Sequence, residues 1–283
     1  ILDAVSQFKE IGHYDTGGLF LDVQSHGRYV YLTDWGEGRL FILDINNPNE
    51  PEKIAFLQIA KRVDRLALEN NYAYVCAQED GLFVVDVSAP DPRIIGSINL
   101  GSRINDIVLS EKNYAYVAHS RLSIVDRSDP QHLYEISAKE ISGANDIFLA
   151  GSYLYVSVEY GDMQIINVNS PPNPELIGSL SFSSDEGGGP IFVSNGFAFI
   201  ANRFYGLRII DVRQPASPRQ IALFKIGTWL DDIFVERDIA YVADVEGLYV
   251  IDVSSPENPQ ELAYFSTAAN KLFVTESYIF LTS

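Results

Sequence analysis

The amino-acid sequence predicts an all-β protein, a seven-bladed β-propeller of four-stranded antiparallel blades. Three short segments recur along the whole chain with a spacing of 39 to 44 residues. The apolar runs are only 4–7 residues long and rich in Val, Ile, Tyr and Phe, so no helical period develops. Of the 13 prolines, 12 fall in one recurring loop, where a residue without a backbone N–H interrupts no strand. A period near 40 residues with four short strands per repeat is typical of propeller blades.

The repeat at residues 145–182 illustrates the four strands. IFL at 147–149 is the first, and the turn at 150–152 leads into the second, YLYVSV at 153–158. MQIINV at 163–168 is the third strand, and ELIGSL at 175–180 follows the proline loop as the fourth. Each third strand ends on a short acceptor side chain, which we expect to bind backbone N–H groups of the proline loop as in an Asx turn. These residues are Asp44, Asp86, Asp126, Asn167, Asp211 and Asp252.

The repeat boundaries predict one domain over residues 1–283. We expect blades at 21–59, 64–100, 105–141, 145–182, 190–226 and 231–266, and a last blade at 270–283 that residues 1–15 complete. ILD at 1–3 resembles the end of a third strand, and KEIGHY at 9–14 resembles the fourth strand ELIGSL. Such closure would pair the last free strand edge. The alternative is six blades followed by a tail.

The composition is that of a globular protein and restricts its partners. Hydrophobic residues make up 47% of the 283 residues, and the formal net charge is −18. An acidic chain is repelled by phosphate backbones and anionic lipids, so we expect no nucleic-acid partner. No apolar run approaches the length of a transmembrane helix, no signal peptide stands at residue 1, and the lone Cys76 leaves no intrachain disulfide.

The order of the strands places irregular loops on one face. We number the strands of a repeat outward from the channel. The loops between second and third strands, and those between one repeat and the next, then share one face, which we call the top face. Candidate ligand-binding residues there are Trp35, His119, Tyr160, Arg203, Phe204 and Trp229. Aromatic side chains on such a face suit a protein or glycan partner; the other interpretation is that they cover the blade ends.

The starts of the first strands bring acidic and amide residues to the mouth of the channel. The acidic candidates are Asp22, Asp64, Asp106, Asp146 and Asp232, near Asn105, Asn145, Asp231 and Asn270, and Arg65 and Lys271 partly offset their charge. Such a ring could seat calcium, which takes six to eight oxygen ligands. The structural interpretation is that each Asp caps a turn or binds the neighbouring blade. Apart from calcium, we expect no cofactor.

Recognised catalytic motifs are missing from the sequence. The four histidines, His13, His26, His119 and His132, are spread over different parts of the predicted ring and cannot form a zinc site. A Ser–His–Asp arrangement would have to use His119 or His13, without a nucleophile elbow. There is no P-loop and no GxGxxG motif.

The repeated core, L-x-I-I/V-D-V followed by S-x-P-x-x-P, resembles the LVIVD-repeat family of β-propellers. GLYVIDVSSPENPQELA and GLRIIDVRQPASPRQIA carry the resemblance best. It implies an exported, periplasmic or cell-surface protein and supplies no catalytic motif. We therefore expect a monomeric, non-enzymatic binding or scaffold domain that engages a protein or glycan through its top face. The alternative is a carboxylate-based hydrolase or lyase, calcium-assisted, at the channel mouth.

Overall fold

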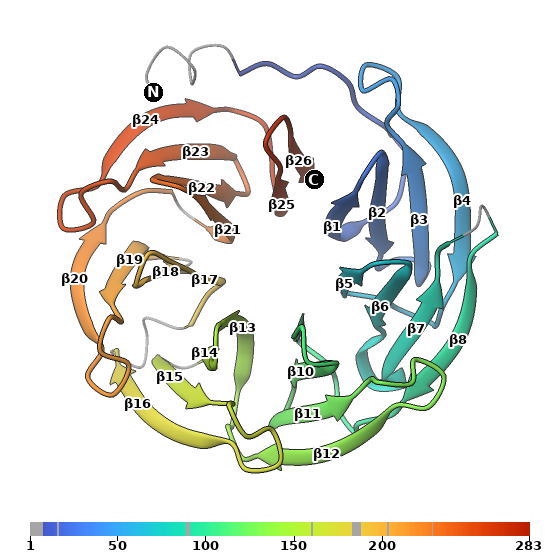
Figure 1. Ribbon diagram of the computed structural model, residues 1–283. Helices are drawn as coiled ribbons and strands as arrows, with labels where there is room; N and C mark the ends of the chain where they lie inside the picture. Colours follow the sequence, from blue (N-terminus) through green and yellow to red (C-terminus); the bar gives the residue numbers. More distant parts are fainter. Residues whose placement is uncertain are drawn as a thin grey trace.

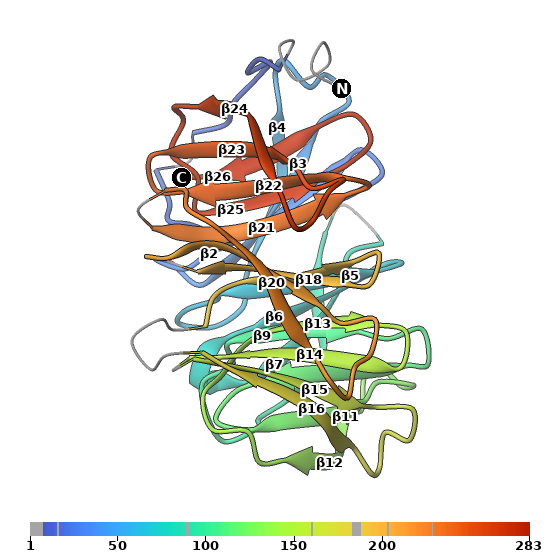
Figure 2. The same cartoon turned by 90° about the vertical axis from the view of Figure 1, so that its left-hand side faces the viewer.

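The computed structural model shows a ring of β-sheets around a central channel (Figure 1). It describes residues 8–15, 17–88, 91–159, 161–182, 188–202, 204–227 and 229–283. Six of the sheets have four antiparallel strands each, in sequence order from the channel outward. Seen from the side, the sheets are stacked one beside the next (Figure 2).

The strands of the six blades have the following bounds. Blade one holds β1 (Phe20–His26), β2 (Tyr29–Asp34), β3 (Arg39–Asp44) and β4 (Glu52–Gln58); blade two holds β5 (Arg65–Glu69), β6 (Tyr72–Cys76), β7 (Leu82–Asp86) and β8 (Arg93–Ile98), with the short 3-10 helix η1 (Gln78–Asp80). Blade three holds β9 (Asp106–Leu109), β10 (Tyr114–Ala118), β11 (Leu122–Asp126) and β12 (Tyr134–Lys139); blade four holds β13 (Ala144–Ala150), β14 (Tyr153–Val158), β15 (Asp162–Asn167) and β16 (Glu175–Ser181). Blade five holds β17 (Ile191–Ser194), β18 (Phe197–Asn202), β19 (Gly206–Asp211) and β20 (Arg219–Phe224); blade six holds β21 (Leu230–Glu236), β22 (Ile239–Asp244), β23 (Gly247–Asp252) and β24 (Gln260–Phe265).

The hydrophobic core lies between neighbouring blades. One cluster joins Tyr116 and Leu122 of blade three to Ile147 and Leu154 of blade four. Second strands are buried on both faces, whereas the outermost β4 is exposed along most of its length. Burial of both faces explains why second and third strands are nearly continuous apolar runs in the sequence.

The prediction of seven four-stranded blades is wrong, because the structure has six. The strands β25 (Lys271–Val274) and β26 (Ile279–Thr282) form a two-stranded sheet that lies between β21 and β1. Residues 8–15 form no strand, and the ILD segment at 1–3 lies outside the described residues.

Close packing explains why KEIGHY resembles a fourth strand without pairing as one. A β-carbon on Gly12 would collide with the carbonyl oxygen of Pro48 in the proline loop of blade one. Gly96 on β8 and Gly178 on β16 meet the proline loops of the following blades in the same way, at Pro130 and Pro215. A glycine at this position therefore indicates close packing against a proline loop, and it does not show that the segment pairs as a β-strand.

The predicted Asx turns are confirmed in every blade. The backbone N–H two residues beyond each acceptor donates to its side-chain oxygen at 2.8–3.1 Å, in the pairs Asn46–Asp44, Ser88–Asp86, Ser128–Asp126, Asn169–Asn167, Arg213–Asp211 and Ser254–Asp252. The repeat of this residue type is thus explained by turn geometry. Over the part of the chain that is described, no helix has the length and apolarity needed to cross a membrane.

Candidate binding site at the mouth of the channel

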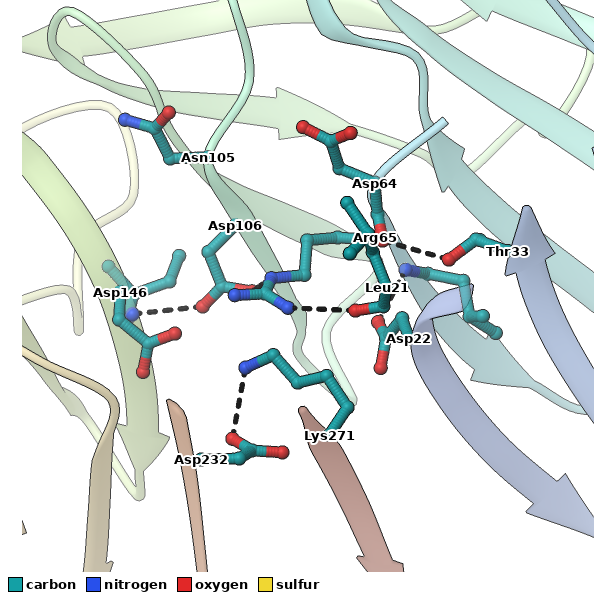
Figure 3. A network of polar contacts seen from close by, with 12 residues as sticks. Leu21, Asp22, Thr33, Asp64, Arg65, Asn105, Asp106, Asp146, Asp232 and Lys271 are labelled. Atoms are coloured by element: carbon teal, nitrogen blue, oxygen red, sulfur yellow. Dashed lines mark hydrogen bonds and ion pairs between the residues drawn. The ribbon is translucent and has the colours of Figure 1, made fainter. Parts of the chain in front are cut away.

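The repeat builds two rings of side chains around the channel, because equivalent residues of the innermost strands lie at equivalent heights. We call the first the mouth ring, made of Leu21, Asp64, Asn105, Asn145, Gly189, Asp231 and Asn270. The residue that follows each of these forms the charged ring, made of Asp22, Arg65, Asp106, Asp146, Pro190, Asp232 and Lys271. Figure 3 shows Arg65 and Lys271 reaching in among the carboxylates of the charged ring.

Each aspartate of the charged ring holds the next sheet around the ring. One carboxylate oxygen accepts the backbone N–H of the following innermost strand, in the pairs Asp22–Leu66 (2.8 Å), Asp106–Ile147 (2.9 Å), Asp146–Ile191 (2.7 Å) and Asp232–Leu272 (2.9 Å). These bonds confirm the structural interpretation of the four residues. They also explain why the same residue type recurs at this position.

Two members of the charged ring are cations, and four of the other five are aspartates. Arg65 donates to the carbonyl oxygen of Leu21 at 3.1 Å, and its Nε lies 3.9 Å from Asp106. Lys271 donates to the second carboxylate oxygen of Asp232 at 3.0 Å. The charged ring therefore carries its own counter-charges.

Burial shifts the ionisation of the charged ring. It raises the pKa of Asp22 from 3.8 to about 6, although Arg65 and Lys271 oppose the shift. Burial, reinforced by the neighbouring charge of Asp146, also holds the pKa of Asp106 well above its usual range, and burial raises the pKa of Asp146 itself. Burial alone would lower the pKa of Arg65, but the surrounding carboxylates, Asp22 foremost, outweigh it and raise that pKa.

No calcium cage is formed by the residues described. Among them, no three or more His, Cys, Asp or Glu side chains come together in a way that could hold a metal ion. The aspartate oxygens contact backbone N–H groups, Arg65 and Lys271 instead.

A polar cavity of about 340 Å³ opens between the two rings. Its lining holds equal numbers of acidic and basic side chains, namely Asp64, Asp146 and Asp231 against Arg65, Arg103 and Lys271, together with the amides Asn105, Asn145 and Asn270. The buried Asp64 accepts hydrogen bonds from Gln78 and from Arg103, each at 3.1 Å. The cavity thus offers both donors and acceptors and has no formal excess of charge.

Aromatic side chains of the top face lie beside this cavity. The Nε1–H of Trp229 donates to Asp231, a lining residue, at 2.8 Å. Phe204 packs edge-to-face against Trp229 with ring centroids 5.0 Å apart, and 65% of Phe204 is exposed. Trp35 is covered by the Arg62 guanidinium, 4.1 Å from the centroid of its ring. Phe204 and Trp229 therefore form an aromatic rim, while Trp35 is paired elsewhere.

The remaining predicted candidates fall into two groups. Tyr160 and Arg203 lie outside the described residues. His119 is only 1% exposed and does not line the cavity; its ring nitrogens contact Ser102 and Ser123 instead. This contact could not be predicted from sequence, because Ser102 and Ser123 carry no motif and lie on separate elements.

A second, larger cavity of about 1250 Å³ was not anticipated. It lies between the two-stranded sheet, residues 8–15 and 17–18, and blades one and six. Apolar side chains such as Phe8, Phe20, Phe265 and Phe280 line part of it. It occupies the place predicted from sequence for the outer strands of a seventh blade.

Comparison with known proteins agrees with this architecture. The LVIVD repeat matches six times, at residues 17–54, 60–99, 103–138, 143–181, 189–223 and 230–267. Among curated proteins, no sequence matches this chain.

Solved structures share the fold at low identity. A functionally unknown protein from Desulfotomaculum acetoxidans DSM 771 is 12% identical with a TM-score of 0.75, over 92% of this chain and 90% of that chain. The periplasmic gluconolactonase PpgL of Pseudomonas aeruginosa is 12% identical with a TM-score of 0.77, over 91% and 87%. Sqt1 of Saccharomyces cerevisiae is 8% identical with a TM-score of 0.71, over 90% and 76%.

The ring of blades and its polar mouth define a β-propeller with one candidate site on its axis. The chain belongs to the LVIVD-repeat family, whose repeat covers most of its length. The likeness to the solved structures shows the fold alone and transfers no activity.

Proposed function

We propose that this propeller is a binding module that holds an uncharged sugar unit of a glycan at the channel mouth and carries out no reaction at that site. The observation that carries the proposal is the charge-balanced polar cavity beside the Phe204–Trp229 rim. An exported, periplasmic or cell-surface location is part of the same proposal, because glycans are abundant there. A monomer suffices, since one chain supplies every lining residue.

The chemistry of the lining favours a polyhydroxylated ligand. Three acidic and three basic side chains offset one another, so neither a phosphate nor a cation has a clear electrostatic advantage. Amides and carboxylates present the donors and acceptors that sugar hydroxyls require. Aromatic side chains offer an apolar face for the C–H groups of a sugar ring.

The size of the cavity argues for a small unit. A volume of about 340 Å³ lies at the lower end of the roughly 300–1,000 Å³ seen for small-molecule sites. One sugar unit fits this space, and the rest of a glycan chain would extend across Trp229 and Phe204. A folded protein partner would use the rim and leave the cavity empty.

The contacts of the charged ring favour binding over carboxylate catalysis. Asp106 and Asp146 have raised pKa values, as an acid catalyst would require. However, one oxygen of each is held by a backbone N–H of the next blade. These contacts favour a role in holding the ring together.

A glycan-binding screen tests the proposal. We expect the protein to bind neutral glycans on an array, and isothermal titration to give a Kd that rises at least tenfold in Trp229→Ala and in Asn145→Ala. Phe56→Ala is the matched control, because Phe56 is an exposed aromatic on the outer strand β4. Thermal melting verifies that each variant folds. Absence of any neutral glycan ligand, or binding that both site variants leave unchanged, would overturn the proposal.

A further inference from the structure

Four polar side chains of blade three and of the loop that leads into it contact one another in series. Ser102, in the loop between β8 and β9, places its Oγ 2.7 Å from Nδ1 of His119. His119 Nε2 lies 2.6 Å from Ser123 Oγ on β11, and that hydroxyl lies 2.5 Å from Glu135 Oε1 on β12. His119 and Ser123 are buried, whereas Ser102 is half-buried.

The direction of each hydrogen bond in this series follows from Glu135, its last member. Arg121 pairs with both oxygens of Glu135, which marks Glu135 as an ionised carboxylate that only accepts. Ser123 must therefore donate its single proton to Glu135 and accept from His119 Nε2–H. In that tautomer Nδ1 carries a lone pair, and the Ser102 hydroxyl donates to it.

We propose that Ser102 is the nucleophile of an acyl-transfer site that hydrolyses small esters, with His119 Nδ1 as its general base. Ser123 and Glu135 orient the imidazole and stabilise the imidazolium, the part that the third member plays in a hydrolase triad. The inference is independent of the proposed glycan binding.

The reaction balances with water as the only co-reactant. Ser102 Oγ attacks the acyl carbon as its proton passes to His119 Nδ1, and the bond from the acyl carbon to the alcohol oxygen breaks. The imidazolium returns the proton to that departing oxygen. Water then attacks the acyl carbon of the acyl-serine and gives its proton to Nδ1. The bond from the acyl carbon to Ser102 Oγ breaks, and the imidazolium returns its proton to Oγ, which releases the carboxylic acid and restores both Ser102 and His119.

The backbone beside Ser102 has free donors. Within the described residues, the N–H groups of Ser102 and Arg103 make no hydrogen bond, so both are available to the oxyanion of the tetrahedral intermediate. Burial, together with Arg121, lowers the pKa of His119 against the opposing charges of Glu135 and Glu140. The imidazole is therefore neutral, and able to act as a base, at neutral pH.

Other blades show that these contacts are not required by the fold. Asp34 and Asp244 end the second strands β2 and β22 at the equivalent position, and each accepts a backbone N–H of its own loop, from Gly36 and Glu246. His119 instead contacts side-chain hydroxyls through both ring nitrogens.

A fluorophosphonate probe and p-nitrophenyl acetate test the proposal. We expect one probe adduct per chain by intact mass, located at Ser102 by peptide mapping and lost in Ser102→Ala. In His119→Gln, labelling and ester hydrolysis should fall by roughly 10²-fold or more. Ser97→Ala is the control, because Ser97 is an exposed serine on β8 outside this set of contacts, and this variant should label at the wild-type rate.

The pH profile distinguishes a catalytic histidine from a structural one. Labelling should rise through a single ionisation centred below pH 6.5, the ordinary value for histidine. No adduct in the wild type, an adduct on another residue, or equal labelling of a folded His119→Gln variant would overturn the proposal. Glycan binding by Ser102→Ala should be unchanged, so failure here leaves the proposed function standing.

Discussion

The carboxylate of Asp106 and the backbone N–H of Ile147 form a 2.9 Å hydrogen bond that joins blade three to blade four. Asp22, Asp146 and Asp232 repeat this bond at three other places around the channel. Each bond lies at the innermost strand, where the blades come closest. The channel aspartates therefore act as links between blades.

Removing the acceptor at position 106 should weaken the ring. Asp106→Ala leaves the buried Ile147 N–H without its partner, which should lower the free energy of unfolding by about 1–3 kcal/mol. Asp106→Asn keeps an acceptor and removes a desolvated charge, so it should unfold close to the wild type at pH 8. Urea denaturation measures both, and equal losses in the two variants would contradict this role.

The channel carboxylates should make the protein more stable in mild acid. The pKa of Asp22 rises to about 6 on folding, so between pH 3.8 and 6 the folded state binds more protons than the unfolded state. The free energy of unfolding then falls as pH rises through this window, and the net charge of −18 acts in the same direction. Below it, stability falls again, because Arg213 lowers the pKa of Asp211 to about 2.

Melting temperatures between pH 3 and 8 measure this profile. In Asp22→Asn, the free energy of unfolding should fall less between pH 4 and 6 than it does in the wild type, by on the order of 1 kcal/mol. A wild-type melting temperature that rises steadily from pH 4 to pH 7 would show that the carboxylates are not desolvated as described.

The Asx turns provide a test with a natural control. Asp252→Ala removes the acceptor for the Ser254 N–H and should cost about 1 kcal/mol. Asp252→Asn should be nearly neutral, because Asn167 makes the same 3.0 Å contact in blade four. Chemical denaturation compares the two, and a costly Asn variant would mean that the charge matters more than the acceptor.

Close packing at the fourth strand should make one glycine irreplaceable. A β-carbon on Gly178 would collide with the Pro215 carbonyl, so Gly178→Ala should cost roughly 1–3 kcal/mol. Gly36→Ala is the control, since the nearest atom to its β-carbon would be 3.5 Å away. A Gly178→Ala variant that melts at the wild-type temperature would show that the proline loop moves to make room for the β-carbon.

Calcium should have no effect on stability. Arg65 and Lys271 already supply positive charge among the carboxylates, and the described residues form no metal cage. A thermal scan with millimolar calcium, and one with a chelator, should give the same melting temperature. A rise of several degrees with calcium would mean that the carboxylates rearrange around the ion.

The repeat made much of the ring predictable. Turn residues such as Asp44 and Asp252 recur for one local reason, so their role follows from spacing alone. The link between Asp22 and the next blade was one of two interpretations, and the contact with Leu66 decides it. The prediction that the starts of the innermost strands meet at the channel mouth also holds for Asp64 and Asn105, which line the same cavity.

Features that depend on unrelated elements were not predictable. The blade count was wrong because Gly12 shares its packing with Gly96 and Gly178 but not their strand pairing. The chain from Ser102 to Glu135 brings together a loop and strands of blade three whose residues carry no common motif. Such contacts depend on the path of the chain, which a repeat pattern does not specify.

The cavity beside the two-stranded sheet makes the protein a candidate for circular permutation. Residues 8–15 and Ser283 line this one cavity, so a short flexible linker could join Ser283 to Phe8. New ends opened in an exposed proline loop, such as the one around Ser255, would interrupt no strand. Each blade would still pack against the same two neighbours, and only the position at which the polypeptide begins would change.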